Sequence, residues 1–239
     1  MNLLINGING KMGKAIKELA IQDSYWTNVY GLCRTIPMPA DDIKFDVMLD
    51  FTHESSLDRV LQIGLDRRLP IIIGTTGYSE EQNQKIKRAS TKIPILHATN
   101  MSLGMNLLFA LVEQTAAILG DKTDIEIIEA HHNRKKDAPS GSAVTIVESI
   151  ERGLGEVRPH QYGRLGECPR EKGEIGIHAI RGGNIVGYHE ANFINELESI
   201  KIVHEAYDRK VFASGAIEAA KFIIGKEPRL YSMKDVLKI

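Results

Sequence analysis

The sequence predicts an α/β protein, with a parallel N-terminal sheet followed by a second α+β domain on a mixed, largely antiparallel sheet. Short apolar runs alternate with helical segments over residues 1–102, as in βαβ units. Long runs that alternate apolar with other residues appear later, between residues 174 and 207. A helical pattern over 213–224 should pack back on the first sheet. We therefore expect one domain over 1–102, completed by 210–239, and a second over 103–209.

The first element is a strand over Asn2–Ile5, and helix-forming sequence runs from Lys14 to Ile21. Between them lies a glycine turn, Asn6-Gly-Ile-Asn-Gly-Lys-Met-Gly13. The backbone amides of such a turn can approach a pyrophosphate at the positive end of a helix, which predicts a Rossmann-like dinucleotide site. Asn9 stands where the G-x-G-x-x-G pattern has its second glycine. Asparagine tolerates a left-handed backbone better than most residues, so we expect the turn to form despite this departure.

The second strand, Asn28–Leu32, ends where an acidic residue would bind the ribose 2′-hydroxyl of NAD. Cys33 and Arg34 stand there instead. Arg34, with Lys11 in the glycine turn, could meet a 2′-phosphate, which favours NADPH over NADH. The alternative is that Arg34 only faces solvent.

Three further strands are predicted in 45–51, 69–77 and 94–101, with helices over 54–66 and 80–90 between them. Because ligands of parallel sheets bind outside the carboxyl ends of the strands, we expect a shared crevice there. Its predicted lining is Thr52, Gly74 to Gly77 and Asn100. His53 and His97 are expected at its rim.

A loop dense in polar residues follows a predicted strand over 123–130 and precedes a helix that begins near Ala143. His131 can exchange a proton near neutral pH, and Lys135 offers a compact cation. Ser140, Gly141 and Ser142 supply backbone N–H groups at the start of the helix, where anions bind. The loop therefore predicts a site for a small acid. The alternative is a solvated basic loop that only caps the helix.

No metal site is expected in this loop, because neighbouring strand residues point to opposite faces and no Cys or Glu completes a ligand set. After a long loop over 153–173, strands are predicted at 174–181, 185–192 and 198–207. We expect them to be adjacent, with Gly182-Gly183 forming a tight hairpin between the first two. His178, His189 and His204 should lie on sheet faces or at an interface.

Bulk properties exclude several classes of protein. The 239 residues are 43% hydrophobic and carry a net charge of −1, which gives no electrostatic case for nucleic acid or a membrane surface. Two cysteines make no disulfide framework. No segment is expected to reach the ~20 apolar residues of a membrane span, and no signal peptide is apparent. We therefore expect a cytoplasmic protein.

Several motifs together resemble the 4-hydroxy-tetrahydrodipicolinate reductase family, also called dihydrodipicolinate reductases, over essentially the whole chain. They are Glu129-Ala-His-His-x-x-Lys-x-Asp-Ala-Pro-Ser-Gly-Ser142, the N-terminal turn, Asp50-Phe-Thr52, Gly74-Thr-Thr-Gly77, Asn100 and Arg181-Gly-Gly183. The resemblance implies reduction of a cyclic intermediate, made from aspartate semialdehyde and pyruvate, to tetrahydrodipicolinate with loss of water. NADH or NADPH would be the reductant, in lysine and diaminopimelate biosynthesis.

The resemblance also implies roles for individual residues. His131 would be the general acid/base and Lys135 the proton donor, while His132, Ser140 and the amides of Gly141 and Ser142 would hold a carboxylate of a small dicarboxylate substrate. Ser142 stands where the family commonly has threonine. Beside Arg34, which is predicted from its position after the second strand, the dinucleotide contacts that the resemblance implies are Gly7, Asn9, Gly10, Lys11, Met12, Gly13, Gly74, Thr75, Thr76, Ala98, Thr99, Asn100 and Met101. A homotetramer built through the second-domain sheets is implied as well.

Two alternatives remain open from the sequence. Another NAD(P)-dependent dehydrogenase of the aspartate pathway would share the nucleotide domain but would need a reactive cysteine or a lysine pair. A non-catalytic dinucleotide sensor would not need His131, His132 and Lys135, and would normally carry a basic helix. Arg181 and Arg209 could bind the substrate acid, or could form surface salt bridges.

Overall fold

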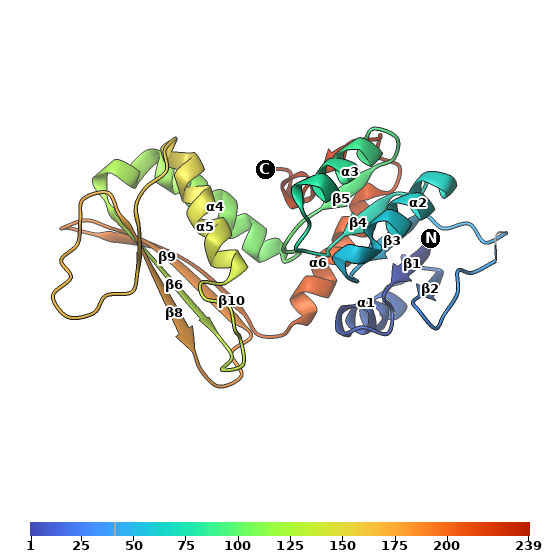
Figure 1. Cartoon of the computed structure of the whole chain (residues 1–239), viewed down its shortest axis with the longest axis horizontal. Helices are drawn as coiled ribbons and strands as arrows, with labels where there is room; N and C mark the ends of the chain where they lie inside the picture. The colour runs from blue at the N-terminus through green and yellow to red at the C-terminus, as the bar shows by residue number, and fades with distance from the viewer. Residues whose placement is uncertain (41) are drawn as a thin grey trace. The chain divides into compact units, whose positions relative to one another are not determined.

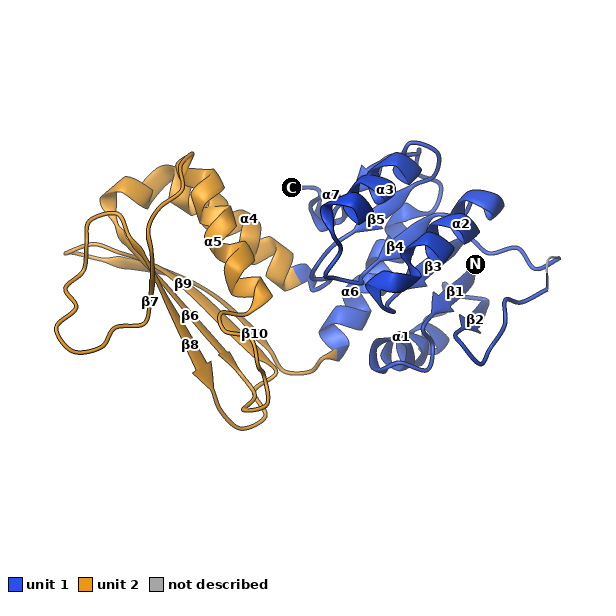
Figure 2. Ribbon diagram, in the orientation of Figure 1, with its two compact units in different colours: residues 1–103, 210–239 blue, residues 104–209 orange. Residues whose placement is uncertain are grey.

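The computed structural model (Figure 1) describes residues 1–40 and 42–239. The chain forms two compact units, coloured separately in Figure 2. The first contains Met1–Leu103 and Lys210–Ile239, and the second contains Gly104–Arg209.

The first unit is built on a parallel six-stranded sheet with the order β11-β5-β4-β3-β1-β2. Ile5 of β1 lies opposite Gly31 of β2 on one side and Leu49 of β3 on the other. The strand order therefore reverses at β1, because β2 lies on one side of it and β3 on the other. Parallel sheets of this kind bind ligands at the point where the strand order reverses. The strands are β1 (Asn2–Asn6), β2 (Asn28–Leu32), β3 (Val47–Asp50), β4 (Ile71–Ile73), β5 (Ile95–His97) and β11 (Leu230–Tyr231).

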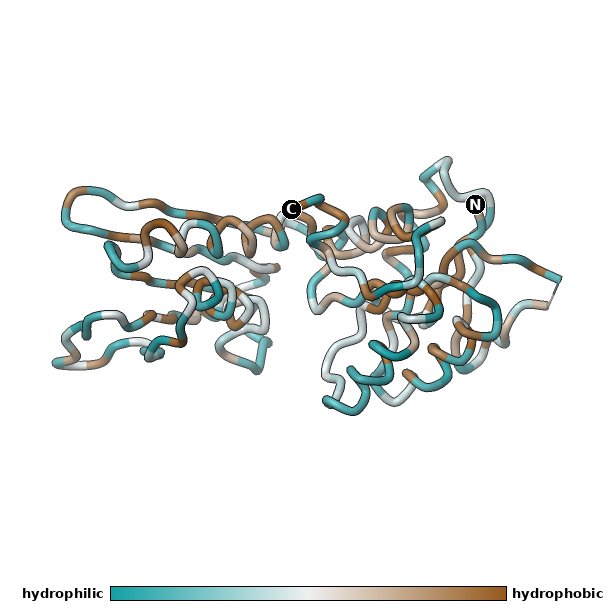
Figure 3. The backbone as a smooth tube through the Cα atoms, turned by 90° about the horizontal axis from the view of Figure 1, so that it is seen from above, coloured by the Kyte–Doolittle hydropathy of each residue, from teal (hydrophilic) through white to brown (hydrophobic). Residues whose placement is uncertain are grey.

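Helices cover both faces of this sheet, so successive residues of one strand enter different cores. Leu3 and Ile5 of β1 pack with α1 and α6, whereas Leu4 packs with α2 and α3. Because both faces of the sheet are covered, its strands are apolar throughout and do not alternate with polar residues. The helices lie at the surface, and hydrophobic and hydrophilic residues alternate along them (Figure 3). The prediction that the late helix packs on the first sheet is confirmed. The helical elements are α1 (Lys11–Gln22), η1 (Glu54–Ser56), α2 (Leu57–Arg67), α3 (Glu80–Ser90), α6 (Lys210–Ile223) and α7 (Met233–Leu237).

The second unit has a mixed five-stranded sheet with the order β10-β9-β6-β8-β7. Two long helices cover one face, as Figure 1 shows. Alternate residues of β6, such as Ile125 and Ile127, enter the core beneath these helices. The elements are α4 (Leu103–Leu119), η2 (Gly120–Lys122), β6 (Asp124–His131), α5 (Gly141–Leu154), β7 (His160–Tyr162), β8 (Ile175–Arg181), β9 (Gly187–Ile194) and β10 (Ser199–Ala206).

The predicted hairpin at Gly182-Gly183 is wrong, because β6 lies between β8 and β9. It pairs in parallel with β8 and antiparallel with β9. The glycine turn closes on the end of β6 instead: the Gly182 N–H donates to the His131 carbonyl at 2.9 Å, and the Asn133 N–H donates to the Gly183 carbonyl at 3.2 Å. The alternating patterns predicted the three strands but did not predict that β6 lies between β8 and β9.

The expectation that no segment reaches the length of a membrane span is also wrong. The helix Leu103–Lys122 is long and apolar enough to pass that test by length and composition. One side of it, with Met105, Phe109 and Val112, is buried in the core of the second unit. No helix was predicted here, and the short elements β7, β11 and α7 were not predicted either.

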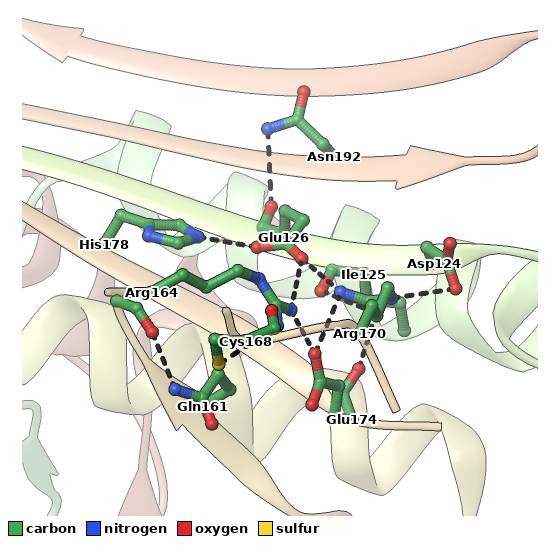
Figure 4. Close-up of polar contacts among 11 residues, drawn as sticks. Asp124, Ile125, Glu126, Gln161, Arg164, Cys168, Arg170, Glu174, His178 and Asn192 are labelled. Carbon is green, nitrogen blue, oxygen red and sulfur yellow. Dashed lines mark hydrogen bonds and ion pairs between the residues drawn. The ribbon is translucent and has the colours of Figure 1, made fainter. Parts of the chain in front are cut away.

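The sheet face of the second unit opposite the helices carries a network of ion pairs (Figure 4). Arg164 pairs with Glu174, Arg170 pairs with Glu126, and His178 Nε2 lies 2.6 Å from Glu126 Oε2. A Cβ on Gly176 would lie 1.8 Å from that same Oε2, so glycine leaves room for the carboxylate. These contacts fix the segment between β7 and β8 against the sheet.

Candidate active site

The candidate active site lies at the end of β6, where the buried apolar residues of this strand are followed by polar ones. Glu129 and His131 continue along β6 on the face that holds Ile125 and Ile127. Glu129 is fully buried, and His131 is partly exposed. Both therefore lie under the helix-covered side of the sheet, at the carboxyl end of its central strand.

The Glu129 carboxylate is bound from three directions. Its Oε2 lies 2.6 Å from His131 Nδ1, and the backbone N–H of Ser140 donates to Oε1 at 3.1 Å. Arg181 of β8 donates to both oxygens, at 2.8 and 2.7 Å. Burial alone would raise the pKa of Glu129, but the hydrogen bonds from His131 and Arg181 lower it to about 2. Glu129 is therefore ionised at neutral pH.

A second histidine lies beside His131 inside the unit. His189 is 4% exposed, and its ring centroid lies 5.1 Å from that of His131. Its Nε2 is 3.1 Å from the hydroxyl of Ser140. Burial, together with the charge of His131, lowers the pKa of His189 to about 4, so its ring is neutral at neutral pH.

Acidification should therefore destabilise the protein partly through His189. The unfolded chain takes up this proton near the ordinary pKa of 6.5, whereas the folded chain resists it down to about 4. The unfolded state binds more protons in that window, so stability present above it is lost as pH falls. We expect the free energy of unfolding in urea to fall between neutral pH and about pH 5, and His189 to account for about 2 kcal/mol of that fall. The variant His189→Gln should lack this part of the loss. An identical pH slope in the variant and wild type would show that His189 is not buried neutral.

The loop after β6 gathers cations around His132. Arg209 donates to His132 Nε2 at 3.0 Å, and Lys135 Nζ donates to Asp137 Oδ2 at 2.9 Å. Burial and the neighbouring positive charges, Arg134 and Arg209 among them, lower the pKa of His132. His132 is therefore a neutral group in positive surroundings. Arg209 therefore contacts this histidine.

The start of α5 faces this loop, with Ser140 as its N-cap. The Ser140 hydroxyl accepts from the Ala143 N–H at 3.2 Å, and its own N–H is bound to Glu129. Ser140 is thus used to hold the helix start. At Gly141, a Cβ would meet nothing within 4 Å, so the approach to the first amides of α5 is open.

The glycine turn of the first unit has the geometry of a pyrophosphate site. Gly7 has φ +84°, and its N–H donates to the Leu32 carbonyl at 2.8 Å. A Cβ on Gly13 would lie 2.2 Å from the Gly7 carbonyl oxygen, so the turn and α1 touch directly. Gly10 caps α1 without a side-chain hydrogen bond, which leaves the helix start uncovered by any side-chain cap.

Asn9 does not use the left-handed backbone that asparagine tolerates. Within residues 1–40 and 42–239, the positive φ angles outside glycine belong to Arg68 and Lys238. The turn needs that conformation only at Gly7. The Asn9 side chain instead donates to Cys33 Sγ at 3.3 Å, which links the turn to the end of β2.

The remaining predicted crevice residues surround a buried carboxylate, Asp50. Its oxygens accept from Asn6 and Thr52, both at 2.7 Å, and from Thr75 at 2.9 Å. Burial raises the pKa of Asp50. The hydrogen bonds of Asp50 join the carboxyl ends of β1, β3 and β4, and no role was predicted for this residue. The Thr75 hydroxyl is consequently directed into the protein.

The other predicted dinucleotide contacts differ in exposure. Thr76, Thr99, Lys11 and Arg34 are exposed, and Asn100 accepts from the Ser102 N–H at 2.9 Å. Met101 is 2% exposed, and its side chain belongs to the core beneath α6. Across residues 1–40 and 42–239, no three His, Cys, Asp or Glu side chains are grouped as metal ligands.

Both parts of the chain match family models for dihydrodipicolinate reductase. Residues 32–101 match the model of its N-terminus, and residues 104–237 match the model of its C-terminus. The chain belongs to the dihydrodipicolinate reductase family. The 4-hydroxy-tetrahydrodipicolinate reductase of Alkaliphilus oremlandii is 66% identical over 239 residues, which cover 100% of this chain and 99% of that protein. The enzyme of the same name from Clostridium novyi is 41% identical over 99% of this chain and 98% of its own.

Solved structures show the same fold. Dipicolinate-bound dihydrodipicolinate reductase from Paenisporosarcina sp. TG-14 has a TM-score of 0.79 at 24% identity and covers 97% of each chain. A probable dehydrogenase from Thermotoga maritima has a TM-score of 0.61 at 9% identity over 99% of this chain and 92% of its own, so it shares the fold alone.

These comparisons confirm the predicted α/β fold class, the predicted family and the predicted activity. Family members are NAD(P)H-dependent oxidoreductases of lysine and diaminopimelate biosynthesis, and this chain is an enzyme of that kind.

Proposed function

We propose that reduction of 4-hydroxy-tetrahydrodipicolinate uses the loop between β6 and α5, with His131 and Lys135 as the groups that exchange protons with the substrate. The supporting observation is that this one loop carries a partly exposed histidine, a lysine and the open start of α5. The reaction removes the substrate hydroxyl as water and consumes one hydride and one proton. His131 and Lys135 are the groups of this loop suited to moving those protons.

The substrate is a small cyclic dicarboxylate, by this proposal. Its carboxylates would be bound by the first amides of α5, at Gly141 and Ser142, and by the cations around His132. The neutral ring of His132 can donate a hydrogen bond to an anion while Arg209 holds its Nε2. The relative from Paenisporosarcina is a dipicolinate-bound protein, and dipicolinate has two carboxylates on a ring.

The dinucleotide would be held by the first unit, at the carboxyl ends of its parallel strands. The close contact of Gly13 with Gly7 and the uncapped start of α1 fit a pyrophosphate. Gly74, Thr76, Ala98, Thr99 and Asn100 follow β4 and β5 at the same edge of the sheet. When bound, the nicotinamide supplies the hydride.

Arg34 gives the site a preference for NADPH in this proposal. Arg34 follows β2 directly after Cys33, is exposed, and has no acidic neighbour at 33–35. We expect Arg34→Ala to raise the KM for NADPH about tenfold, as loss of a charge-assisted contact should, and to change the KM for NADH little. Arg59→Ala, at an exposed arginine on α2, is the control and should change neither. If Arg34→Ala changed the KM for NADPH and for NADH equally, Arg34 would not be the residue that binds the 2′-phosphate.

The test of the activity is oxidation of NADPH and of NADH, followed by absorbance. The substrate is generated in situ from pyruvate and aspartate semialdehyde by a synthase. Substrate-dependent loss of absorbance supports the reaction and ranks the two cofactors. No loss with either, from folded protein that binds dinucleotide, would contradict the proposal.

We further propose a cytoplasmic homotetramer assembled through the uncovered face of the second-unit sheet. Ile180 and Val203 on that face are 51% and 50% exposed. Apolar residues exposed on an uncovered sheet are typical of an interface. Cys33 and Cys168 are both free thiols, as is usual in a reducing compartment. Light scattering should give about four times the chain mass of 26.6 kDa.

A further inference from the structure

The buried carboxylate of Glu129 has no role in the proposal above, yet it contacts the candidate acid/base directly. We propose that Glu129 is a positioning residue that keeps the His131 proton on Nδ1, so that Nε2 is the nitrogen that exchanges protons with the substrate. By binding Ser140 as well, Glu129 fixes His131 relative to the start of α5. This inference rests on the proposed role of His131.

The assignment of the proton follows from what Glu129 can accept. An ionised carboxylate has no proton to donate, and its Oε2 lies 2.6 Å from His131 Nδ1. Nδ1 must therefore be the donor in this contact, in the neutral ring as well as in the protonated one. Only Nε2 is left to take up and release a proton during a reaction.

The surroundings leave Nε2 accessible. Gly187 of β9 lies beneath the ring, where a Cβ would come within 3.4 Å of Nε2. Even a Cβ at position 187 would only reach ordinary van der Waals contact with Nε2, and glycine leaves that space open. The ring itself is partly exposed, whereas Glu129 is fully buried. The buried end of the ring is thus held, and the other end can reach a ligand.

The charges that face the pair come from each packed element. Arg181 of β8 donates to both oxygens of Glu129 and balances its charge. His189 of β9 is neutral, because burial lowers its pKa to about 4. In the following loop, Lys135 is paired with Asp137. Glu129 and Arg181 together add no net charge beside His131.

The same carboxylate also sets where the substrate anion would lie. Its Oε1 accepts from the N–H of Ser140, the residue that caps α5. The histidine ring and the helix start are therefore bound to two oxygens of one rigid group. A shift of Glu129 would change the distance between the acid/base and the anion site, on which positioning in catalysis depends.

Glu129→Gln tests this proposal with little change in shape. The N–H of Ser140 and the Nη2 of Arg181 both donate to Oε1, so the amide oxygen should take that position. The amide NH₂ then replaces Oε2. There it loses the hydrogen bond from Arg181 Nη1 and donates to His131 Nδ1, which forces the His131 proton onto Nε2. We expect kcat to fall about a hundredfold or more, because a wrong tautomer of a general base is severely damaging. The substrate KM and the dinucleotide Kd should stay within about threefold.

The tautomer can be observed directly by solid-state ¹⁵N NMR of histidine-labelled protein at about pH 9, well above the usual histidine range. The His131 signals are those absent from His131→Gln. We expect a proton on Nδ1 in the wild type and on Nε2 in Glu129→Gln. A wild-type proton on Nε2 would overturn the proposal, even where the Gln variant folds poorly.

Glu174→Gln is the matched control. Glu174 is also a buried, arginine-paired carboxylate of the second unit, but it lies in the ion-pair network of Figure 4 on the opposite face. It should alter stability without altering the His131 tautomer or kcat. Equal losses of kcat in both variants would mean that Glu129 acts only through stability. Absence of reductase activity in the wild type would defeat the proposed function, whereas the tautomer is measured without turnover.

Discussion

Replacing His131 by Gln should lower kcat by about a hundredfold or more and leave the dinucleotide Kd unchanged, since a general acid/base typically contributes on that scale. Glutamine keeps the size and polarity of the side chain but cannot titrate. Steady-state kinetics with saturating dinucleotide, together with dinucleotide binding by fluorescence, separates the two quantities. Near-wild-type turnover would remove His131 from its proposed role.

His178→Gln provides the control for this experiment. His178 belongs to the same sheet and makes a contact of the same kind, with its Nε2 2.6 Å from Glu126 Oε2. Its side chain lies on the opposite face, in the network of Figure 4. We expect its replacement to leave kcat within about twofold of wild type, because this pair lies outside the candidate active site and contacts none of its residues. A comparable loss there would show that any histidine–glutamate pair of this sheet affects turnover.

Gly13→Ala should weaken dinucleotide binding on the order of a hundredfold, or about 2.7 kcal/mol. The added Cβ would lie 2.2 Å from the Gly7 carbonyl oxygen, so either the turn or α1 must move. That movement shifts the amides that would meet the pyrophosphate. Binding is measured by fluorescence titration, and circular dichroism checks that the variant is folded. Unchanged affinity would show that this turn does not bind the pyrophosphate.

Gly10→Ala makes a graded comparison with this variant. A Cβ at position 10 would lie 3.1 Å from the Gly7 carbonyl oxygen, farther than a Cβ at position 13. Gly10 has a φ of −71°, which alanine adopts freely. We expect a loss of affinity well below that of Gly13→Ala. The reverse order would mean that steric contact with Gly7 is not what sets the affinity.

The elements that the sequence predicted best are those with local signals at their ends. The helix Glu80–Ser90 begins with a capping box between Ser79 and Gln82, and it carries acids in its first turn and bases in its last. Its predicted and observed bounds agree. Strand order has no such signal. The position of β6 between β8 and β9 depends on contacts across the sheet, which the alternating pattern of each strand does not encode.

The residues of the candidate site also fall into those with a local sequence signal and those that depend on contacts between distant segments. His131 and Lys135 were predicted from residue type and spacing within one loop. The partners of Glu129 could not be predicted, because Arg181 is 52 residues away in the sequence. A signal was nevertheless present: a carboxylate interrupts an otherwise apolar face of β6. Asp50 is a second example, since it ends the fully buried strand β3 and accepts a hydrogen bond from Thr75 in the loop after β4. A charged residue at a core position of a strand indicates a buried partner.

The return of α6 to the first unit has a consequence for the order in which the protein forms during synthesis. Ala216, Ile217 and Ile223 of α6 are part of the core that covers one face of the first sheet. A ribosome delivers this helix only after the whole of 104–209. Until translation is nearly finished, the nascent first unit therefore has only α1 to cover that face of its sheet, and the second unit is free to fold before it.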